Sequence, residues 1–255
     1  LSVIYVIVAF FFITGDYTNK QNIIYFVGSL IIFAGGIATN TRGGWIAIAC
    51  SFFISTPYII TNRVYLKKYV ALILASIVVF IVIDITSGGI LFLNRVMPMF
   101  FQIKEISKGY ISPEFGSRRF EIWMNSMGIV SKYWIIGSGP DTFTTVYRNF
   151  GFYPKDSAGK TQIIFLSAHN ESLQLLITTG VFSLLTYWGI VGSIMLKGIK
   201  QINVDRKIVP LILGLICYLV KGIFNCSVVT DMIIFWVLLA LINSNKIEKN
   251  VVNSL

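Results

Sequence analysis

The only histidine of the chain, His169, stands at the entrance of an apolar run that begins near residue 170. Its imidazole changes protonation near physiological pH, which suits a general base. Asn170, Gln174 and Thr178 follow at intervals of four residues, so on a helix they form one polar stripe. We interpret this cluster as one base beside a water-accessible pocket. The simpler alternatives are a solvated His169 and an Asn170 that only caps the helix.

Three arginines in two places offer binding sites for an anion. Arg42 lies in a glycine-rich turn between two apolar runs, next to Trp45, while Arg118 and Arg119 are adjacent in a longer polar region. A guanidinium group stays charged and matches phosphate oxygens with a fork of N–H donors. These arginines therefore suit a phosphate or pyrophosphate group at a membrane surface. The competing interpretation is attraction to anionic lipid headgroups.

Several common catalytic arrangements are missing from the sequence. It contains no serine–histidine–acid order, no glycine-rich phosphate loop, no dinucleotide fingerprint and no cluster of metal ligands. Cys50, Cys217 and Cys226 lie in or beside apolar runs without metal-ligand spacing, so we interpret them as small core residues. We therefore predict chemistry that needs neither a metal ion nor a cofactor.

The composition indicates which elements position these residues. Of 255 residues, 55% are hydrophobic and only 13% are charged, whereas about a quarter of the residues are charged in soluble domains. Several apolar runs approach the roughly 20 residues that a helix needs to cross a bilayer. The predicted fold class is therefore all-α, a polytopic transmembrane helix bundle. The predicted spans are residues 2–14, 22–39, 44–60, 69–86, 170–195 and 208–243, the last divided near Lys221 to Ser227 into a hairpin.

The net charge of +10 resides largely in short loops between apolar runs. This pattern is typical of cytoplasmic loops and of contact with anionic membrane lipids, and it argues against nucleic-acid binding. It predicts a multi-pass protein of the cytoplasmic (inner) membrane, with the Arg42 turn and residues 87–168 on the outer side. The loop residues that set this orientation are Arg63, Lys67, Lys68, Lys197, Lys200, Arg206, Lys207, Lys246 and Lys249.

The segment 87–168 is too long to lack structure in a compact protein. Apolar residues at helical spacing predict an amphipathic helix over 119–133, and the glycines of 137–140 predict a turn after it. We expect this extracytoplasmic loop to cover a site at the membrane interface. The whole chain, 1–255, is predicted to be one transmembrane domain. Because Leu1 already lies inside an apolar run, we expect it to be the C-terminal part of a longer protein.

In combination, these motifs resemble the O-antigen ligase/polymerase superfamily, the bacterial lipid-linked glycan polymerase C-terminal family. The resemblance covers about residues 30–195 and depends on the order of its motifs as well as on their shared outer location. Thr41 stands where the family usually has Ser, and Ser183 stands where the ligase motif commonly has Gly, Thr or Tyr. The matching motifs are Arg42-Gly43-Gly44-Trp45, Arg119 to Trp123, Gly137-Ser138-Gly139-Pro140, and His169-Asn170 with Gly180.

The resemblance implies a metal-independent, inverting glycosyltransferase whose donor is a polyprenyl-pyrophosphate-linked oligosaccharide. Its acceptor would be the hydroxyl group of a glycan or a lipid. By this analogy Arg42 and Arg119 hold the pyrophosphate and His169 activates the acceptor, which makes these three the expected catalytic residues. The expected substrate-binding residues are Arg118, Asn170, Gln174 and Trp123.

The sequence leaves two alternatives to a transferase open. A membrane transporter or transport accessory protein would use charged residues in or near the spans, namely Asp84, Lys221 and Asp231. A non-catalytic membrane scaffold would use all of its charges structurally, and it would tolerate substitution of Arg42 and His169.

Overall fold

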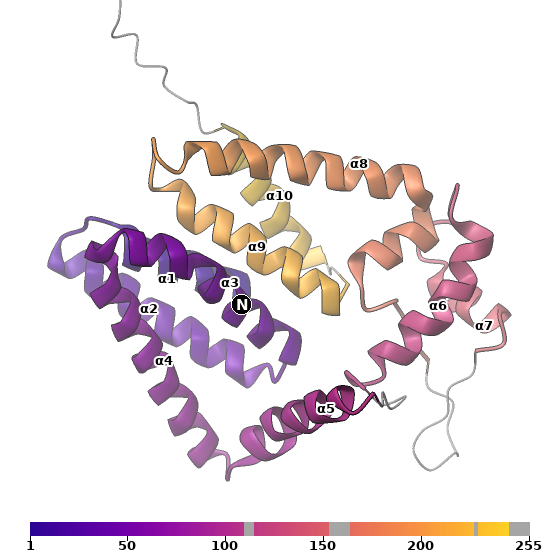
Figure 1. Cartoon of the computed structure of the whole chain (residues 1–255), viewed down its shortest axis with the longest axis horizontal. Coiled ribbons are helices and arrows are strands. Elements are labelled where there is room, and N and C mark those ends of the chain that lie inside the picture. Colours follow the sequence, from indigo (N-terminus) through magenta and orange to yellow (C-terminus); the bar gives the residue numbers. More distant parts are fainter. Residues whose placement is uncertain (110–114, 153–163, 227–228, 245–255) are drawn as a thin grey trace, which may run out of the picture. The chain divides into compact units, whose positions relative to one another are not determined.

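The computed structural model describes residues 1–109, 115–152, 164–226 and 229–244. Within these ranges every regular element is a helix, which confirms the all-α class (Figure 1). A 3₁₀ turn at Arg63–Tyr65 and a π-helical turn at Phe92–Val96 accompany the α-helices. The α-helices are α1 (Ser2–Thr14), α2 (Asn19–Ala38), α3 (Arg42–Thr61), α4 (Leu66–Thr86), α5 (Met97–Ser107), α6 (Arg119–Tyr133), α7 (Phe143–Asn149), α8 (Glu171–Gln201), α9 (Ile208–Phe224) and α10 (Val229–Ser244).

Each predicted membrane span coincides with an apolar helix. Among the described residues, four helical stretches are long and apolar enough to cross a bilayer, namely Asn19–Ala38, Arg42–Thr61, Arg63–Thr86 and Glu171–Gln201. The helices α1, α9 and α10 are apolar but shorter. The stretch 208–243 is divided after Phe224, within the predicted interval, and the end of that interval at Ser227 lies outside the described residues. The chain is therefore a polytopic helical membrane protein.

Contacts within the chain define two compact units. We call the first the bundle unit; its described residues are 1–88, 191–220 and 229–244. We call the second the loop unit, which consists of residues 89–190 and 221–226 apart from the segments that are not described. The prediction of a single transmembrane domain over 1–255 stays a prediction.

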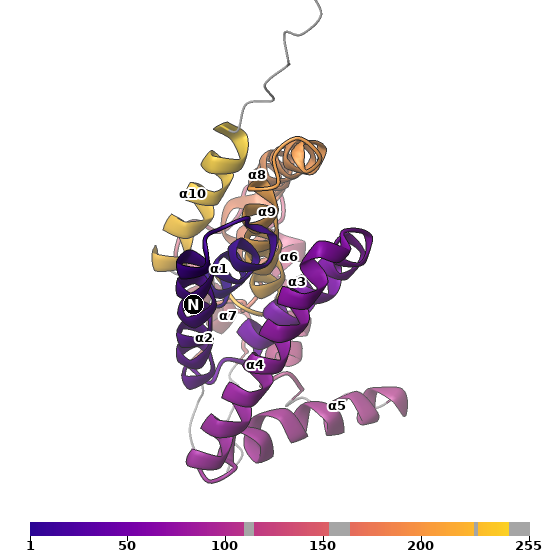
Figure 2. The same cartoon turned by 90° about the vertical axis from the view of Figure 1, so that its left-hand side faces the viewer.

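In the bundle unit, α1 lies against α2, α3 and α4, and Figures 1 and 2 both show these helices side by side. Helix α1 is apolar almost throughout, and its side chains Val6, Ala9 and Phe10 are fully buried. A helix that is apolar on all sides belongs inside a bundle. On α3, by contrast, Phe53 is 79% exposed, as expected for a side chain that faces lipid.

The basic loops of the bundle unit lie at one end. Arg206, in the connection between α8 and α9, donates a hydrogen bond from Nη1 to the hydroxyl of Tyr65 at 2.9 Å. Tyr65 itself lies in the connection between α3 and α4. Lys197 Nζ donates to Asn243 Oδ1 at 2.9 Å, so the last turns of α8 and α10 also meet there. These basic connections thus share one end of the unit, and the side of the membrane that this end faces stays a prediction. Lys246 and Lys249 lie outside the described residues.

Helix α8 is interrupted at Gly180, where φ is 81° and ψ is 176°. The sequence predicts one continuous span over 170–195, and the break at Gly180 is the main difference between that prediction and the structure. At the break, the N–H of Val181 donates to the carbonyl of Trp134 at 2.7 Å instead of to its own helix. The freed carbonyls of Ile177 and Thr178 accept the N–H groups of Ser138 and Gly139 at 2.8 and 2.9 Å.

The turn after α6 therefore inserts into the break in α8, and two glycines make this approach possible. A Cβ atom at Gly180 would lie 2.2 Å from the carbonyl oxygen of Ile135. A Cβ atom at Gly137 would lie 2.4 Å from the carbonyl oxygen of Thr178. Both glycines also have a positive φ, of 81° and 86°, which side chains disfavour. Only glycine fits at either position. We call this contact the glycine junction.

Candidate functional site

The site is built on a short connection, Ser167 to Asn170, that enters α8 within the loop unit. Its central residue, Ala168, is completely buried. The Ala168 N–H donates to Gln174 Oε1 at 2.8 Å, and its carbonyl accepts the indole N–H of Trp123 at 3.1 Å. Helix α6 and the first turn of α8 thus hold the backbone on both sides of this residue. The next residue, His169, is fixed in position as a result.

The packing that supports this connection is a compact apolar cluster of the loop unit. Its buried members come from α6, α7, the connection that carries Ala168 and the start of α8. Trp123 and Phe165 pack against the cluster from its edge. The fully or nearly fully buried members are Ile122, Ile129, Phe143, Val146, Tyr147, Ala168, Leu173 and Ile177.

His169 adopts the left-handed backbone region, with φ at 49°. Histidine is one of the residues that enter this region more readily than most. Its Nδ1 lies 3.4 Å from Oδ1 of Asn225, in the connection between α9 and α10. With Asn225 Oδ1 as the acceptor, Nδ1 carries the proton, and the lone pair of Nε2 is available to accept another. That is the tautomer required for a base acting through Nε2.

Burial lowers the pKa of His169 below the usual value of 6.5, and the positive charge of Arg119 lowers it further. The hydrogen bond with Asn225 acts in the opposite direction. Because a base must be unprotonated to accept a proton, the lowered pKa keeps the imidazole in its active form at neutral pH.

The two adjacent arginines precede α6 in an unusual backbone conformation. Gly116, Ser117 and Arg118 all have positive φ values, of 62°, 61° and 66°. Arg118 then pairs with Glu121, with 3.1 Å between Nε and Oε2. Arg119 begins α6 and donates from Nη1 to the carbonyl of Gly116 at 3.1 Å. Because the charge of Arg119 acts on His169, Arg119 lies close enough to be the candidate for holding a phosphate beside it.

The predicted substrate-binding residues all lie in the loop unit, where each makes a contact within the protein. Asn170 Oδ1 accepts the N–H of Leu173 at 3.0 Å and so caps α8. Gln174 and Trp123 hold Ala168, as described above. These contacts orient His169, and direct contact of the three residues with a substrate stays a prediction.

Arg42 lies in the bundle unit, at the first position of α3. It lies inside a tight turn, because the N–H of Gly44 donates to the carbonyl of Thr41 at 3.1 Å. The loop unit brings together His169, Arg119 and Arg118, and the cooperation of Arg42 with them stays a prediction.

Asn225 is the member of the site that the sequence did not reveal. It follows α9 directly, 56 positions after His169. Its neighbour Cys226, interpreted as a core residue, places Sγ 3.9 Å from Gln174 Oε1. The only sequence signal near Asn225 is a short polar interruption of the apolar stretch 208–243. This interruption predicted the break between two helices, but not a contact with His169. Among the described residues, no group of three His, Cys, Asp or Glu side chains is arranged to hold a metal ion.

The fold and the site define a class: polytopic helical membrane proteins that carry a histidine–arginine site in a large segment between two of their spanning helices. A family model described as O-antigen ligase matches residues 27–188, more than half of the chain. The matched part contains Arg42, Arg119 and His169. No curated protein sequence matches the chain significantly. The chain belongs to the O-antigen ligase family, which is a family of membrane glycan-processing proteins and indicates a glycosyltransferase type of enzyme.

Proposed function

We propose that this protein transfers or polymerises a polyprenyl-pyrophosphate-linked glycan onto an acceptor hydroxyl at the outer face of the cytoplasmic membrane. The observation that carries the proposal is His169, half-buried, held by Asn225 and placed near Arg119 within the region that matches the family. One base beside one cation is what a single displacement at a sugar phosphate needs.

In the proposed reaction, the Nε2 atom of His169 accepts the proton of the acceptor hydroxyl as its oxygen attacks the anomeric carbon. The bond from the anomeric carbon to the pyrophosphate oxygen breaks, and the electron pair leaves with polyprenyl pyrophosphate. A single displacement inverts the anomeric configuration. Arg119 and Arg42 stabilise the negative charge that develops on the leaving group. The chemistry requires no metal ion or cofactor, because the arginines supply the positive charge.

The experiment that tests this proposal replaces His169 with Ala and, separately, with Gln, which retains hydrogen bonding but not a base of suitable pKa. We expect transfer of glycan from the purified lipid-linked donor to fall by at least about a hundredfold in both variants. In cells, lipid-linked donor should accumulate while surface polymer or conjugate disappears. Replacing Arg119 with Ala should also reduce transfer.

The matched control for Arg119 is Arg148→Ala, which removes an exposed arginine at the end of α7 in the same unit. This variant should transfer glycan at the wild-type rate. If His169→Ala retained full activity at equal membrane levels, the assigned base would be wrong. Unchanged donor and polymer pools would instead favour transport.

A further inference from the structure

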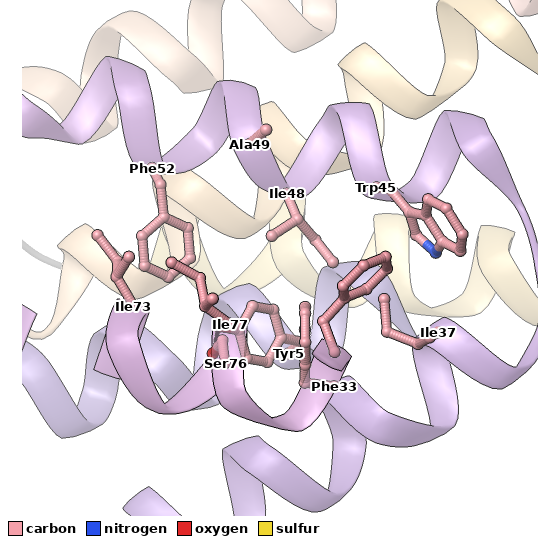
Figure 3. Close-up of a pocket in the computed structure, with 11 residues that line it drawn as sticks. Tyr5, Phe33, Ile37, Trp45, Ile48, Ala49, Phe52, Ile73, Ser76 and Ile77 are labelled. Atoms are coloured by element: carbon pink, nitrogen blue, oxygen red, sulfur yellow. Dashed lines mark hydrogen bonds between the residues drawn. The ribbon is translucent and has the colours of Figure 1, made fainter. Parts of the chain in front are cut away.

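The bundle unit contains an apolar groove among α1, α2, α3 and α4 (Figure 3). Its cavity volume is about 370 Å³. Tyr5 and Phe52 in its floor are only 2% and 8% exposed, whereas Ile77 at its rim is 49% exposed. The groove therefore opens at the outer surface of helices that span the membrane, where hydrocarbon chains are available to enter it.

The polar groups in the groove are few. The hydroxyls of Tyr5 and Ser76 lie 2.9 Å apart and satisfy each other. In the part of the chain that the structure describes, Nε1 of Trp45 is buried and has no hydrogen-bond partner. The groove thus fits an apolar occupant along most of its length, with one N–H donor for an acceptor at the Trp45 end.

One end of the groove lies next to the turn that carries Arg42. Figure 3 shows Trp45 and Ile37 at one end and Phe52 and Ile73 at the other. Ile37 and Trp45 flank the turn that carries Arg42. Because Arg42 and Trp45 are three positions apart on α3, they are separated by a rise of about 4.5 Å along the helix. A phosphate held by Arg42 would therefore lie within about one helical turn of the Trp45 end of the groove.

From this geometry we infer that the groove binds the first isoprene units of the polyprenyl chain of the donor. The inference rests on the proposed function, and it adds a binding site for the lipid part of the substrate. In a polyprenyl pyrophosphate the hydrocarbon chain begins at the phosphate oxygen, whereas a phospholipid has a glycerol unit in between. The one-turn separation of Arg42 from the groove fits the former.

The volume sets the length of chain that is bound. An apolar cavity of about 150 Å³ is sufficient for one benzene molecule. A groove of 370 Å³ therefore holds roughly two or three isoprene units, and the rest of the chain remains in the bilayer. Affinity for the donor should rise with chain length up to about three units and change little beyond that.

Photolabelling in nanodiscs tests this inference with a polyprenyl pyrophosphate that carries a diazirine in its second isoprene unit. We expect labelled peptides from α4 around Ile77 and from α3 around Ile48. Ile77→Trp fills the groove from its rim and should reduce this labelling about tenfold, which is the factor expected for displacing roughly two methylene groups. The control is Val78→Trp, at an exposed position of the same helix that does not line the groove, and its labelling should match wild type.

Equal labelling in the Ile77→Trp and Val78→Trp variants would overturn the groove assignment. So would competition by phosphatidylglycerol as strong as competition by unlabelled polyprenyl pyrophosphate, because the groove would then be a general lipid site. The KM of the donor gives a second measurement. Ile77→Trp should raise the KM of a donor with three isoprene units about tenfold more than it raises the KM of a donor with one unit. Labelling does not require glycan transfer, so failure of the His169 experiment is distinguishable from failure of this one.

Discussion

At the scale of single residues, the histidine that we propose as the base is held by contacts from three separate parts of the chain. Trp123 of α6 and Gln174 of α8 fix the backbone before His169, and Asn225 contacts its ring. These contacts fix both the position of the imidazole and the nitrogen that carries its proton. In the proposed reaction Asn225 is therefore a positioning residue, which acts on the acceptor only through His169.

Replacing Asn225 with Asp tests this role through the pH profile. A carboxylate beside the imidazole favours its protonated form, so the pKa of His169 should rise from its lowered native value. Because His169 must be neutral, activity is lost as pH falls through this pKa. The acid limb of kcat/KM should therefore move to higher pH in the variant, while the limb of the wild type should lie below 6.5, the ordinary histidine value.

The measurement is the rate of transfer between about pH 5 and pH 8, the range in which histidine pKa values lie. Asn225→Ala serves as the comparison, since it removes the contact without adding a charge and should not move the acid limb upward. A limb that stayed in place in Asn225→Asp, with a uniformly lower rate, would indicate that Asn225 serves only the fold.

The sequence singled out His169 because it is the only histidine, and Arg118 and Arg119 because they are adjacent. The resemblance to the family then joined them, with Arg42, into one expected site. Asn225 could not be predicted in the same way. Its contact joins residues 56 positions apart, and no periodicity or spacing within the chain signals such a pairing. Tertiary contacts of this kind depend on where the α9–α10 connection folds back.

At the scale of the elements, the glycine junction gives a structural reason for two motifs that carry no reactive group, the glycine turn 137–140 and Gly180. Gly137 and Gly180 allow the turn after α6 to hydrogen-bond with the interrupted backbone of α8. Helix α6 contributes Trp123 and Arg119, while α8 begins directly after His169 and Asn170. The junction therefore fixes the two elements that present the site.

Gly180→Ala should break the junction. The added methyl group would lie 2.2 Å from a backbone oxygen, and φ at this position is 81°. We expect a loss of about 2 kcal/mol or more in the stability of the loop unit, together with reduced transfer. Thermal unfolding and limited proteolysis in detergent measure the first effect.

Gly189→Ala is the matched control on the same helix, because an added Cβ there meets nothing within 4 Å. Alanine favours helix over glycine, so this variant should be as stable as wild type or slightly more stable. Equal stability of both variants would contradict the importance of the junction.

The elements were predicted unevenly. The sequence predicts an amphipathic helix over 119–133, and α6 has these bounds. The prediction succeeded because apolar residues at helical spacing and a glycine turn mark this helix clearly. The short helices α5 and α7 were not predicted, since 11 and 7 residues give too little periodicity for a firm assignment. The break in α8 was missed because glycine inside an apolar run is usually tolerated, and only the partner at Ile135 makes it necessary.

At the scale of the whole molecule, charge determines the proposed orientation. The contacts of Arg206 with Tyr65 and of Lys197 with Asn243 place several basic connections at one end of the bundle unit. The positive-inside rule predicts that this end faces the cytoplasm. The loop unit follows α4 and would then lie on the outer side.

Cysteine labelling in intact cells tests this orientation. The native Cys50, Cys217 and Cys226 are first replaced by Ala or Ser, after which one cysteine is introduced at a time. A membrane-impermeant maleimide should label Met124→Cys on α6, which is 59% exposed, without permeabilisation. Val204→Cys, 61% exposed at the basic end, should be labelled only after the membrane is opened. The reverse labelling pattern would show that the protein has the opposite orientation in the membrane, which would exclude an outward-facing site.

The short length of α9 has a consequence for the bilayer itself. Its 17 residues rise about 26 Å, which is less than the ~30 Å thickness of a typical hydrocarbon core. The connection that carries Asn225 follows α9 immediately, so it lies close to hydrocarbon depth unless the bilayer becomes thinner around it. A locally thinned membrane would bring water and lipid phosphates to His169. The rate of glycan transfer would then depend on the acyl-chain length of the surrounding lipids.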